Sequence, residues 1–326
     1  MKIESEPLLD FCDVYLKPSI VSFIRSREEI DTSISIGDRQ LKFPLIGSPM
    51  KDVCDGNFGS KLIDLGCFGI IHRFSEVKQQ LVEFEKNKQL GIAIGTNGNY
   101  LEIYRKFIQQ GCNLFCIDVA NGANIVVKET IECCLGVGKS QFIVGNVASA
   151  ETFKWAATLP NVVAVRVGIA GGNACTTKNA TGIYCPMASL IRECKEIKDN
   201  CGIEVKIIAD GGIKEPSDFC KAIALGADCV MMGSVLAAAT DSPAELIKRD
   251  GKFYKIYHGS ASFEIQKTYK EKPKYIEGRT ALLDFNNETI EQIVGKFIDG
   301  LKSSMSYFDS KNISEFHKNS ILCYEK

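Results

Sequence analysis

Short apolar runs alternate with longer amphipathic segments along most of this 326-residue chain. There are eight runs, each with the length of one buried strand: 43–47, 67–71, 91–95, 114–118, 142–145, 162–167, 205–209 and 229–232. Most are separated by about 20 to 30 residues, which accommodates a parallel strand and its crossover helix. One intervening segment has Pro216 near its start and Gly226 at its end, as helices often do. The pattern predicts an α/β protein with a (β/α)8 barrel; a doubly wound open sheet is the alternative.

The repeat ends near residue 250, and no stretch has the composition of a linker or a second domain. We therefore expect a single domain over residues 1–326. A lysine-rich polar stretch, 267–274, predicts a mobile surface flap at about 260–280. Residues from about 281 to 326 are expected to form a C-terminal tail.

The net charge is −1, with 45% apolar and 24% charged residues, so no overall field would attract nucleic acid. The first residues do not resemble a signal peptide, and no apolar run approaches the ~20 residues that span a bilayer. The 14 cysteines are scattered without a Cys-x-x-Cys pair, and only three histidines occur. We expect a cytoplasmic protein with reduced core thiols, no zinc site and no membrane or nucleic-acid partner.

A glycine-rich turn follows the sixth apolar run and leads to Cys175. Glycines let the backbone approach a ligand closely, and a thiolate is a strong nucleophile near neutral pH. One alternative is that Cys175 is another buried thiol. A core cysteine needs neither a glycine turn before it nor the hydroxyls of Thr176 and Thr177 after it, which favours a nucleophile.

Glycine-containing turns also follow the seventh and eighth runs: Asp210, Gly211, Gly212, Gly233 and Ser234. In barrels the loops after these two strands commonly bind phosphate through backbone N–H groups. The alternative is that these glycines only make tight turns. A phosphate there would bring Asp210 close to ribose hydroxyls. Asp118, at the end of the fourth run, and Glu277, beyond the flap, carry little weight by themselves.

Together these segments resemble the IMP dehydrogenase/GMP reductase family. The matching pieces occur in the family's order: Asp13–Pro18, Ser26–Ser33, Gly47–Met50, Gly69–His72, Gly145–Val147, the Cys175 loop, Ile208–Gly212 and Met232–Ser234. The resemblance covers nearly the whole chain. It implies a (β/α)8 barrel, a homotetramer, and a purine nucleoside monophosphate bound across the barrel top.

The resemblance also implies roles for individual residues. Cys175 would attack purine C2, while Glu277 acts through Thr177 as the acid for the leaving amine. The substrate would be held by Ser48, Met50, Asp210, Gly211, Gly212, Gly233, Ser234, Gly259, Ser260 and Ser262. Asp118, Asn121, Gly122 and Gly168 would line the cofactor side. A monovalent cation, K⁺, would bind backbone carbonyls of Ala170, Gly172 and Cys175.

Two features favour the reductase branch of this family. Residues 70–74 run directly into the next helical segment, so the regulatory (CBS) insertion of many IMP dehydrogenases is missing. The flap also lacks, between Ser262 and Glu277, the Arg-Tyr pair with which dehydrogenases activate water. The sequences of residues 257–262 and 277–279 resemble those of bacterial GMP reductases.

The resemblance therefore implies NADPH-dependent reduction of GMP to IMP and ammonia. One alternative is IMP dehydrogenase, which converts IMP, NAD⁺ and water to XMP and NADH. Another is a purine-nucleotide binding protein without catalysis. Ala170 and Lys51, which depart from the family pattern, keep that last alternative open.

Overall fold

A closed ring of eight parallel strands forms the centre of the computed structural model, which describes residues 8–268 and 271–324. In chain order the strands are β4 (Leu45–Gly47), β5 (Phe68–Ile71), β6 (Gly91–Ile94), β7 (Leu114–Asp118), β8 (Gln141–Val147), β9 (Val162–Val167), β10 (Lys206–Asp210) and β11 (Cys229–Met232). The last strand pairs with the first, which closes the barrel. Each predicted run supplies one strand, so the (β/α)8 barrel is confirmed and the open sheet is wrong.

Helices cover the outside of the barrel. They are α1 (Gly56–Asp64), α2 (Val77–Lys86), α3 (Tyr100–Gln109), α4 (Ile125–Leu135), α5 (Ala150–Ala157), α7 (Met187–Cys201), α8 (Pro216–Ala224) and α11 (Ile290–Tyr307). Ile46, Phe68 and Met231 belong to the apolar cluster that fills the interior. Because helices bury the outer face and this cluster the inner one, the strands are apolar on both faces.

A short hairpin, β2 (Ile34–Ile36) and β3 (Arg39–Leu41), plugs the amino end of the barrel. Ile36 and Leu41 are buried in the interior cluster. The amide of Asp38 donates to Gln141 Oε1 (3.1 Å), at the first residue of β8. With this end plugged, the carboxyl ends of the strands are the open face of the barrel.

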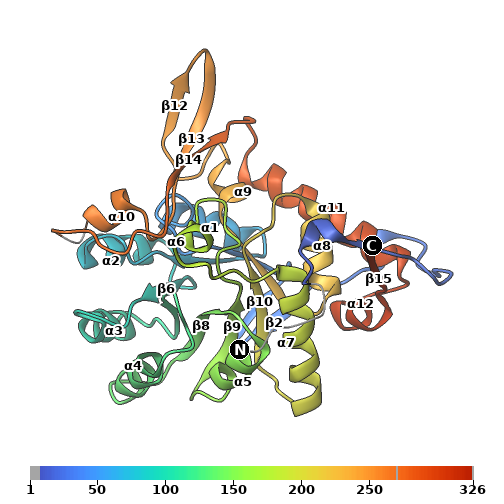
Figure 1. Ribbon diagram of the computed structural model, residues 1–326, viewed down its shortest axis with the longest axis horizontal. Coiled ribbons are helices and arrows are strands. Elements are labelled where there is room, and N and C mark those ends of the chain that lie inside the picture. Colours follow the sequence, from blue (N-terminus) through green and yellow to red (C-terminus); the bar gives the residue numbers. More distant parts are fainter. Residues whose placement is uncertain (1–7, 269–270, 325–326) are drawn as a thin grey trace.

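The chain leaves the repeat after β11. A short helix, α9 (Ser234–Ala237), leads to an antiparallel sheet of β12 (Leu246–Arg249), β13 (Lys252–His258) and β14 (Thr280–Asp284). The β12–β13 hairpin projects away from the barrel (Figure 1). The predicted flap lies between β13 and β14 and contains α10 (Phe263–Lys267). Within it, Tyr269 and Lys270 lie outside the described residues.

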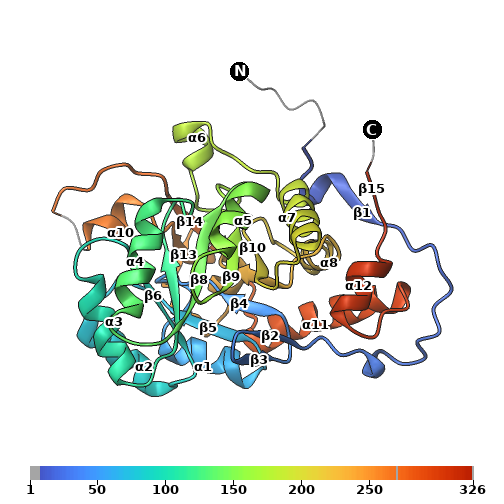
Figure 2. The ribbon, with the colours of Figure 1, turned by 90° about the horizontal axis from the view of Figure 1, so that it is seen from below.

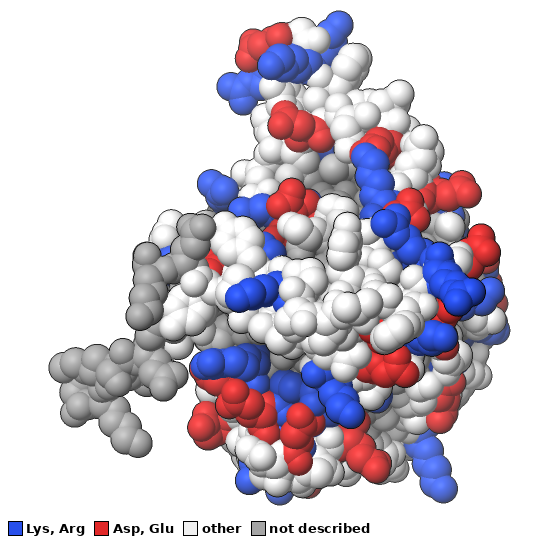
Figure 3. Space-filling model, turned by 90° about the vertical axis from the view of Figure 1, so that its right-hand side faces the viewer, with Lys and Arg blue, Asp and Glu red and all other residues white. Residues whose placement is uncertain are grey.

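The segment expected to form a tail contains ordered elements. Its first helix, α11, packs against α8 and so completes the ring of helices. After α12 (Ile313–Asn319), the last strand β15 (Leu322–Tyr324) pairs with β1 (Val14–Leu16), so the first and last strands of the chain lie side by side (Figure 2). Figure 3 shows acidic and basic side chains mixed over the face that carries these elements. No helix in the described ranges combines the length and apolar character needed to cross a bilayer.

Candidate active site

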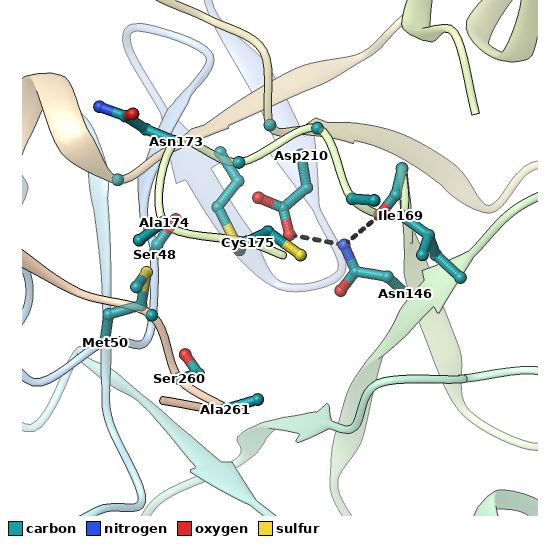
Figure 4. A pocket seen from close by; sticks show the side chains of 18 of the residues that line it. Ser48, Met50, Asn146, Ile169, Asn173, Ala174, Cys175, Asp210, Ser260 and Ala261 are labelled. Atoms are coloured by element: carbon teal, nitrogen blue, oxygen red, sulfur yellow. Dashed lines mark hydrogen bonds between the residues drawn. The ribbon is translucent and has the colours of Figure 1, made fainter. Parts of the chain in front are cut away.

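A cavity of about 610 Å³ opens at the carboxyl ends of the barrel strands. Figure 4 shows part of its lining, including Cys175, Asp210 and Met50. Most of the residues predicted from the sequence line it: Ser48, Met50, Asp118, Gly168, Ala170, Gly172, Cys175, Thr177, Asp210, Gly211, Gly212, Gly233, Ser234, Gly259, Ser260 and Glu277. Segments far apart in the sequence thus meet over one end of the barrel.

Three predicted site residues are not part of this lining. The Asn121 side chain accepts a bond from the Ala123 amide (3.1 Å), which forms a local turn. Gly122 packs so closely that an added Cβ would lie 2.9 Å from the carbonyl carbon of Gly145. Ser262 is fully buried, and its hydroxyl accepts from the Ile265 amide at the start of α10 (3.3 Å). All three have structural contacts that account for them without a ligand.

The sulfur of Cys175 begins a chain of hydrogen bonds that ends at a carboxylate. Cys175 Sγ lies 3.2 Å from Thr177 Oγ1, which lies 2.8 Å from Glu277 Oε2. A hydroxyl has one hydrogen, so Thr177 accepts from the thiol while it donates to the carboxylate. This direction lets a proton move from the sulfur to Glu277 and back.

Backbone pairing with the flap fixes the position of Glu277. The Thr176 amide donates to the Glu277 carbonyl (2.9 Å), and the Arg279 amide donates to the Ala174 carbonyl (2.9 Å). An isolated antiparallel bridge joins Cys175 to the residue after Glu277. The loop also crosses close to Gly259, where an added Cβ would lie 2.6 Å from the Ala174 oxygen. Close approach of two backbones therefore explains that glycine.

Below the cavity, Arg166 joins two carboxylates that the sequence analysis treated separately. Its Nη1 lies 2.9 Å from Asp118 Oδ1, and its Nη2 and Nε lie 2.8 and 3.1 Å from Asp210 Oδ2. Arg73 Nε contacts the other oxygen of Asp118 (3.1 Å). The sequence analysis missed Arg166, although it is the one charged residue in the apolar run 162–167. A lone charge within a buried strand is a signal for a buried partner.

These ion pairs determine the protonation states of the network. Burial by itself raises the pKa of Asp118, but the positive charges of Arg166 and Arg73 outweigh it and hold that pKa below its ordinary value. Burial opposes the charge of Arg166 too, yet the carboxylates of Asp210 and Asp118, with the Cys116 thiol, raise the pKa of Arg166 well above its ordinary value. Asp118 and Arg166 therefore stay charged near neutral pH.

Asp210 receives its hydrogen bonds on one side only. Asn146 Nδ2 donates to Asp210 Oδ2 (2.8 Å) and also to the Gly168 carbonyl (2.7 Å), as Figure 4 shows. The bonds from Arg166 reach the same oxygen. Asp210 Oδ1 takes part in none of them, so it can accept hydrogen bonds from a ligand hydroxyl.

Glycine turns follow β10 and β11, and the second lies beside Tyr257 of β13. Gly211 and Gly212 have φ of +106° and +80°, a conformation that favours glycine. At Gly233 an added Cβ would lie 2.4 Å from Tyr257 Oη. Burial raises the pKa of Tyr257, so its hydroxyl keeps its proton near neutral pH. Backbone N–H groups and this hydroxyl suit an anion such as a phosphate.

The predicted cation site has a distinctive backbone. Ala170 has φ +65°, which is uncommon for a residue with a Cβ. The Gly172 carbonyl accepts a bond from the Cys175 amide (3.1 Å), so one of its lone pairs is occupied. In the part of the chain that the structure describes, no cluster of three or more His, Cys, Asp or Glu side chains could hold a metal ion.

Comparison with known proteins agrees with this arrangement. The family described as "IMP dehydrogenase / GMP reductase domain" matches residues 8–324. A GMP reductase of Clostridium acetobutylicum is 32% identical over 94% of this chain and 93% of the relative. A GMP reductase of Chromobacterium violaceum is 31% identical over 92% of both chains, and human GMP reductase 2 is 29% identical over 97% and 94%. The chain therefore belongs to the IMP dehydrogenase/GMP reductase family.

Proposed function

We propose that this protein catalyses the NADPH-dependent reductive deamination of GMP to IMP and ammonia. The observation that carries the proposal is the hydrogen-bonded chain from Cys175 through Thr177 to Glu277. It lies in a cavity whose glycine turns and aspartate suit a nucleoside monophosphate. The similar proteins named GMP reductase support the same reaction.

The first half of the reaction replaces nitrogen by sulfur at purine C2. Cys175 attacks C2, and its thiol proton passes through the Thr177 hydroxyl to Glu277. The same proton then returns through Thr177 to the 2-amino group, which leaves as ammonia. A thioimidate bond now joins Cys175 to the purine. The thiol has supplied the hydrogen that the ammonia carries away, so atoms and charge balance.

The second half removes the sulfur. A bound reduced nicotinamide supplies the hydride that C2 needs to become the C2–H of IMP. The Cys175 sulfur leaves with the bonding electrons, since thiolates are good leaving groups. A proton taken up from water then reaches the thiolate through Glu277 and Thr177 and restores the starting state.

The cavity has one wall suited to the GMP phosphate and another suited to the nicotinamide cofactor. Gly233 and Ser234 follow β11, whereas Asp118 ends β7, four strands away around the eight-stranded barrel. The phosphate turns and the Asp118 wall therefore face each other across the opening. Arg73, beside Asp118, is partly exposed and offers further N–H donors for a carboxamide or a phosphate. These residues fit a nicotinamide nucleotide on the side opposite the substrate phosphate.

A simple assay tests the reaction. The protein is mixed with GMP and NADPH, with GMP and NADH, and with IMP and NAD⁺, while the absorbance of the reduced nicotinamide is followed. We expect loss of absorbance with GMP and faster loss with NADPH than with NADH. A gain with IMP would instead identify a dehydrogenase. No change in any mixture, with tight GMP binding by calorimetry, would identify a binding protein.

The matched variant is Cys175→Ser. It keeps the size of the side chain but replaces the nucleophile with a poorer one, so turnover should fall by at least about 10³-fold. GMP binding should survive. Turnover close to that of the unaltered protein would refute the covalent mechanism.

The homotetramer, the cytoplasmic location and a K⁺ ion at the carbonyls of Ala170, Gly172 and Cys175 stay predictions from the family resemblance. Light scattering of the purified protein tests the subunit number. Turnover measured in potassium and in lithium salts tests the ion, and equal rates would count against it.

A further inference from the structure

Tyr275 differs from every other aromatic residue that lines the cavity. It lies two residues before Glu277, and 87% of its surface is exposed. Tyr257, the other tyrosine of the lining, is only 4% exposed. A tyrosine ring left in water at the rim of a cavity is available to contact a ligand.

The backbone at Tyr275 is held in place although its side chain is not packed. Gln266, which is 3% exposed, donates through Nε2 to the Tyr275 carbonyl (3.3 Å). The Lys274 amide donates to Oε1 of the same glutamine (3.2 Å). Tyr275 also has φ +54°, an unfavourable region for a residue with a Cβ. The fold thus maintains an unfavourable backbone and an exposed ring at the same position.

This combination suits stacking on a flat ring. Because the backbone at Tyr275 is already ordered, this segment loses little additional conformational freedom when a ligand covers the side chain. Aromatic side chains stack on nucleobases with substantial affinity and little dependence on the base. The reaction proposed above brings two such rings next to Cys175, the purine and the nicotinamide.

We propose that Tyr275 stacks on a heteroaromatic ring of a bound nucleotide and covers the open side of the cavity beside Cys175. The proposal rests on the proposed function for the identity of the nucleotides. The ring belongs either to the substrate or to the cofactor, and separate titrations distinguish them.

A fluorescent side chain at this position reports stacking directly. The chain has one tryptophan, Trp155 on α5, which is not part of the cavity lining. The variant Tyr275→Trp, made with Trp155→Phe, is titrated with GMP alone, with NADP⁺ alone and with both. We expect saturable quenching by one of the nucleotides at the concentrations at which calorimetry detects binding. If calorimetry detects binding but none of the three titrations quenches the fluorescence, the proposal is overturned.

Steady-state kinetics provide the second readout. Tyr275→Ala should raise the KM of the stacked nucleotide about tenfold with little change in kcat, and Tyr275→Phe should restore it. The matched control is Tyr307→Ala, which removes a 60% exposed tyrosine from the end of α11, outside the cavity. Unchanged KM values in Tyr275→Ala overturn the stacking role.

The two proposals fail in different ways. If the unaltered protein does not turn over GMP with NADPH, the proposed function fails. Quenching of the tryptophan variant by GMP or NADP⁺ would then still support stacking. If turnover is normal but Tyr275→Ala and the tryptophan variant show no effect, only the stacking role is lost.

Discussion

The floor and the rim of the cavity are built on different principles. On the floor, Arg166 joins Asp118 and Asp210 through several short ion pairs, and all three side chains are nearly buried. They stand on barrel strands. At the rim, Cys175 and Glu277 lie on loops, and their side chains are linked only through single hydrogen bonds to one hydroxyl. Two backbone hydrogen bonds pair the loops themselves.

Because of this difference, we expect the floor to contribute mainly to stability and the rim mainly to turnover. Buried ion pairs between strands resist movement, because breaking one leaves a charge without a partner. Loops joined by a few hydrogen bonds open more readily and can adjust as a ligand enters and leaves. Damage to the floor should therefore weaken the fold and binding, and damage to the rim should stop turnover while the fold persists.

Glu277→Gln gives the largest expected effect at the rim. The amide oxygen can still accept a bond from Thr177, but the side chain can no longer carry a proton. Turnover should fall by about 10²–10⁴-fold in kcat, whereas GMP binding and the melting temperature should not change. Glu264→Gln, an exposed carboxylate on α10 of the same flap, is the control. Near-normal kcat in Glu277→Gln would remove this residue from the mechanism.

Arg166→Met gives the largest expected effect on the floor. It leaves Asp118 and Asp210 buried without their shared cation, which should lower the free energy of unfolding by about 3–5 kcal/mol. Denaturant unfolding measures the loss, and the KM for GMP should rise as Asp210 loses its orientation.

The control for this change is Lys106→Met on α3. Lys106 forms an exposed pair with Glu102 (2.6 Å), and such pairs contribute little. We expect a change of less than about 0.5 kcal/mol. Equal losses in the two variants would contradict the special role of the floor.

Acid should lower the stability of the barrel through His72. His72 follows β5, its Nδ1 accepts from the Phe74 amide (3.1 Å), and burial together with the charge of Lys51 lowers its pKa to about 4. In the unfolded chain this pKa is about 6.5, so between pH 6.5 and 4 only the unfolded state binds the proton. Stability is complete above pH 6.5 and should fall by about 3 kcal/mol as pH decreases to 4.

His72→Asn tests this source of the pH dependence. The asparagine oxygen can replace Nδ1 as acceptor but does not titrate. Unfolding free energies measured from pH 7 to pH 4 should therefore fall less steeply in the variant. Identical slopes in the two proteins would show that other groups cause the decline.

The smallest effect on stability and turnover is expected from the hydrogen bond between Tyr184 and Asp10, near the start of the chain. The Tyr184 hydroxyl donates to Asp10 Oδ2, and Lys178 Nζ lies 3.9 Å from the centre of the Tyr184 ring. Tyr184→Phe keeps the ring and loses one bond to a carboxylate, which should cost about 1–2 kcal/mol of stability and a few-fold in kcat. The control is Tyr15→Phe, a half-exposed tyrosine on β1. Equal losses of stability and kcat in the two variants would rule out a specific role for the Tyr184–Asp10 hydrogen bond.

The sequence predicted the barrel because its evidence is local and repeated. Eight apolar runs at regular spacing indicate strands buried on both faces, and each forms one. The Cys175 loop and the glycine turns were found for the same reason, since each is a short contiguous segment. Glu277 was found only through the family resemblance.

Three predicted site residues lie outside the cavity lining, because other structural contacts engage them. Ser262 looked like a ligand contact, yet its hydroxyl caps a helix. Gly122 and Asn121 follow Asp118 along the chain, but backbone packing and a local turn account for them. Polar residues next to a site in sequence do not necessarily face it.

The sequence alone determined the succession of eight strands, the glycine turns and the candidate nucleophile, since these depend on residues close together along the chain. The partnership of Arg166 with Asp118 and Asp210, and the pairing of the flap with the Cys175 loop, were decided only by the tertiary structure. Closure of the barrel brings the ends of β7, β9 and β10 within hydrogen-bonding distance. No pattern within one segment specifies which distant charges will share that space.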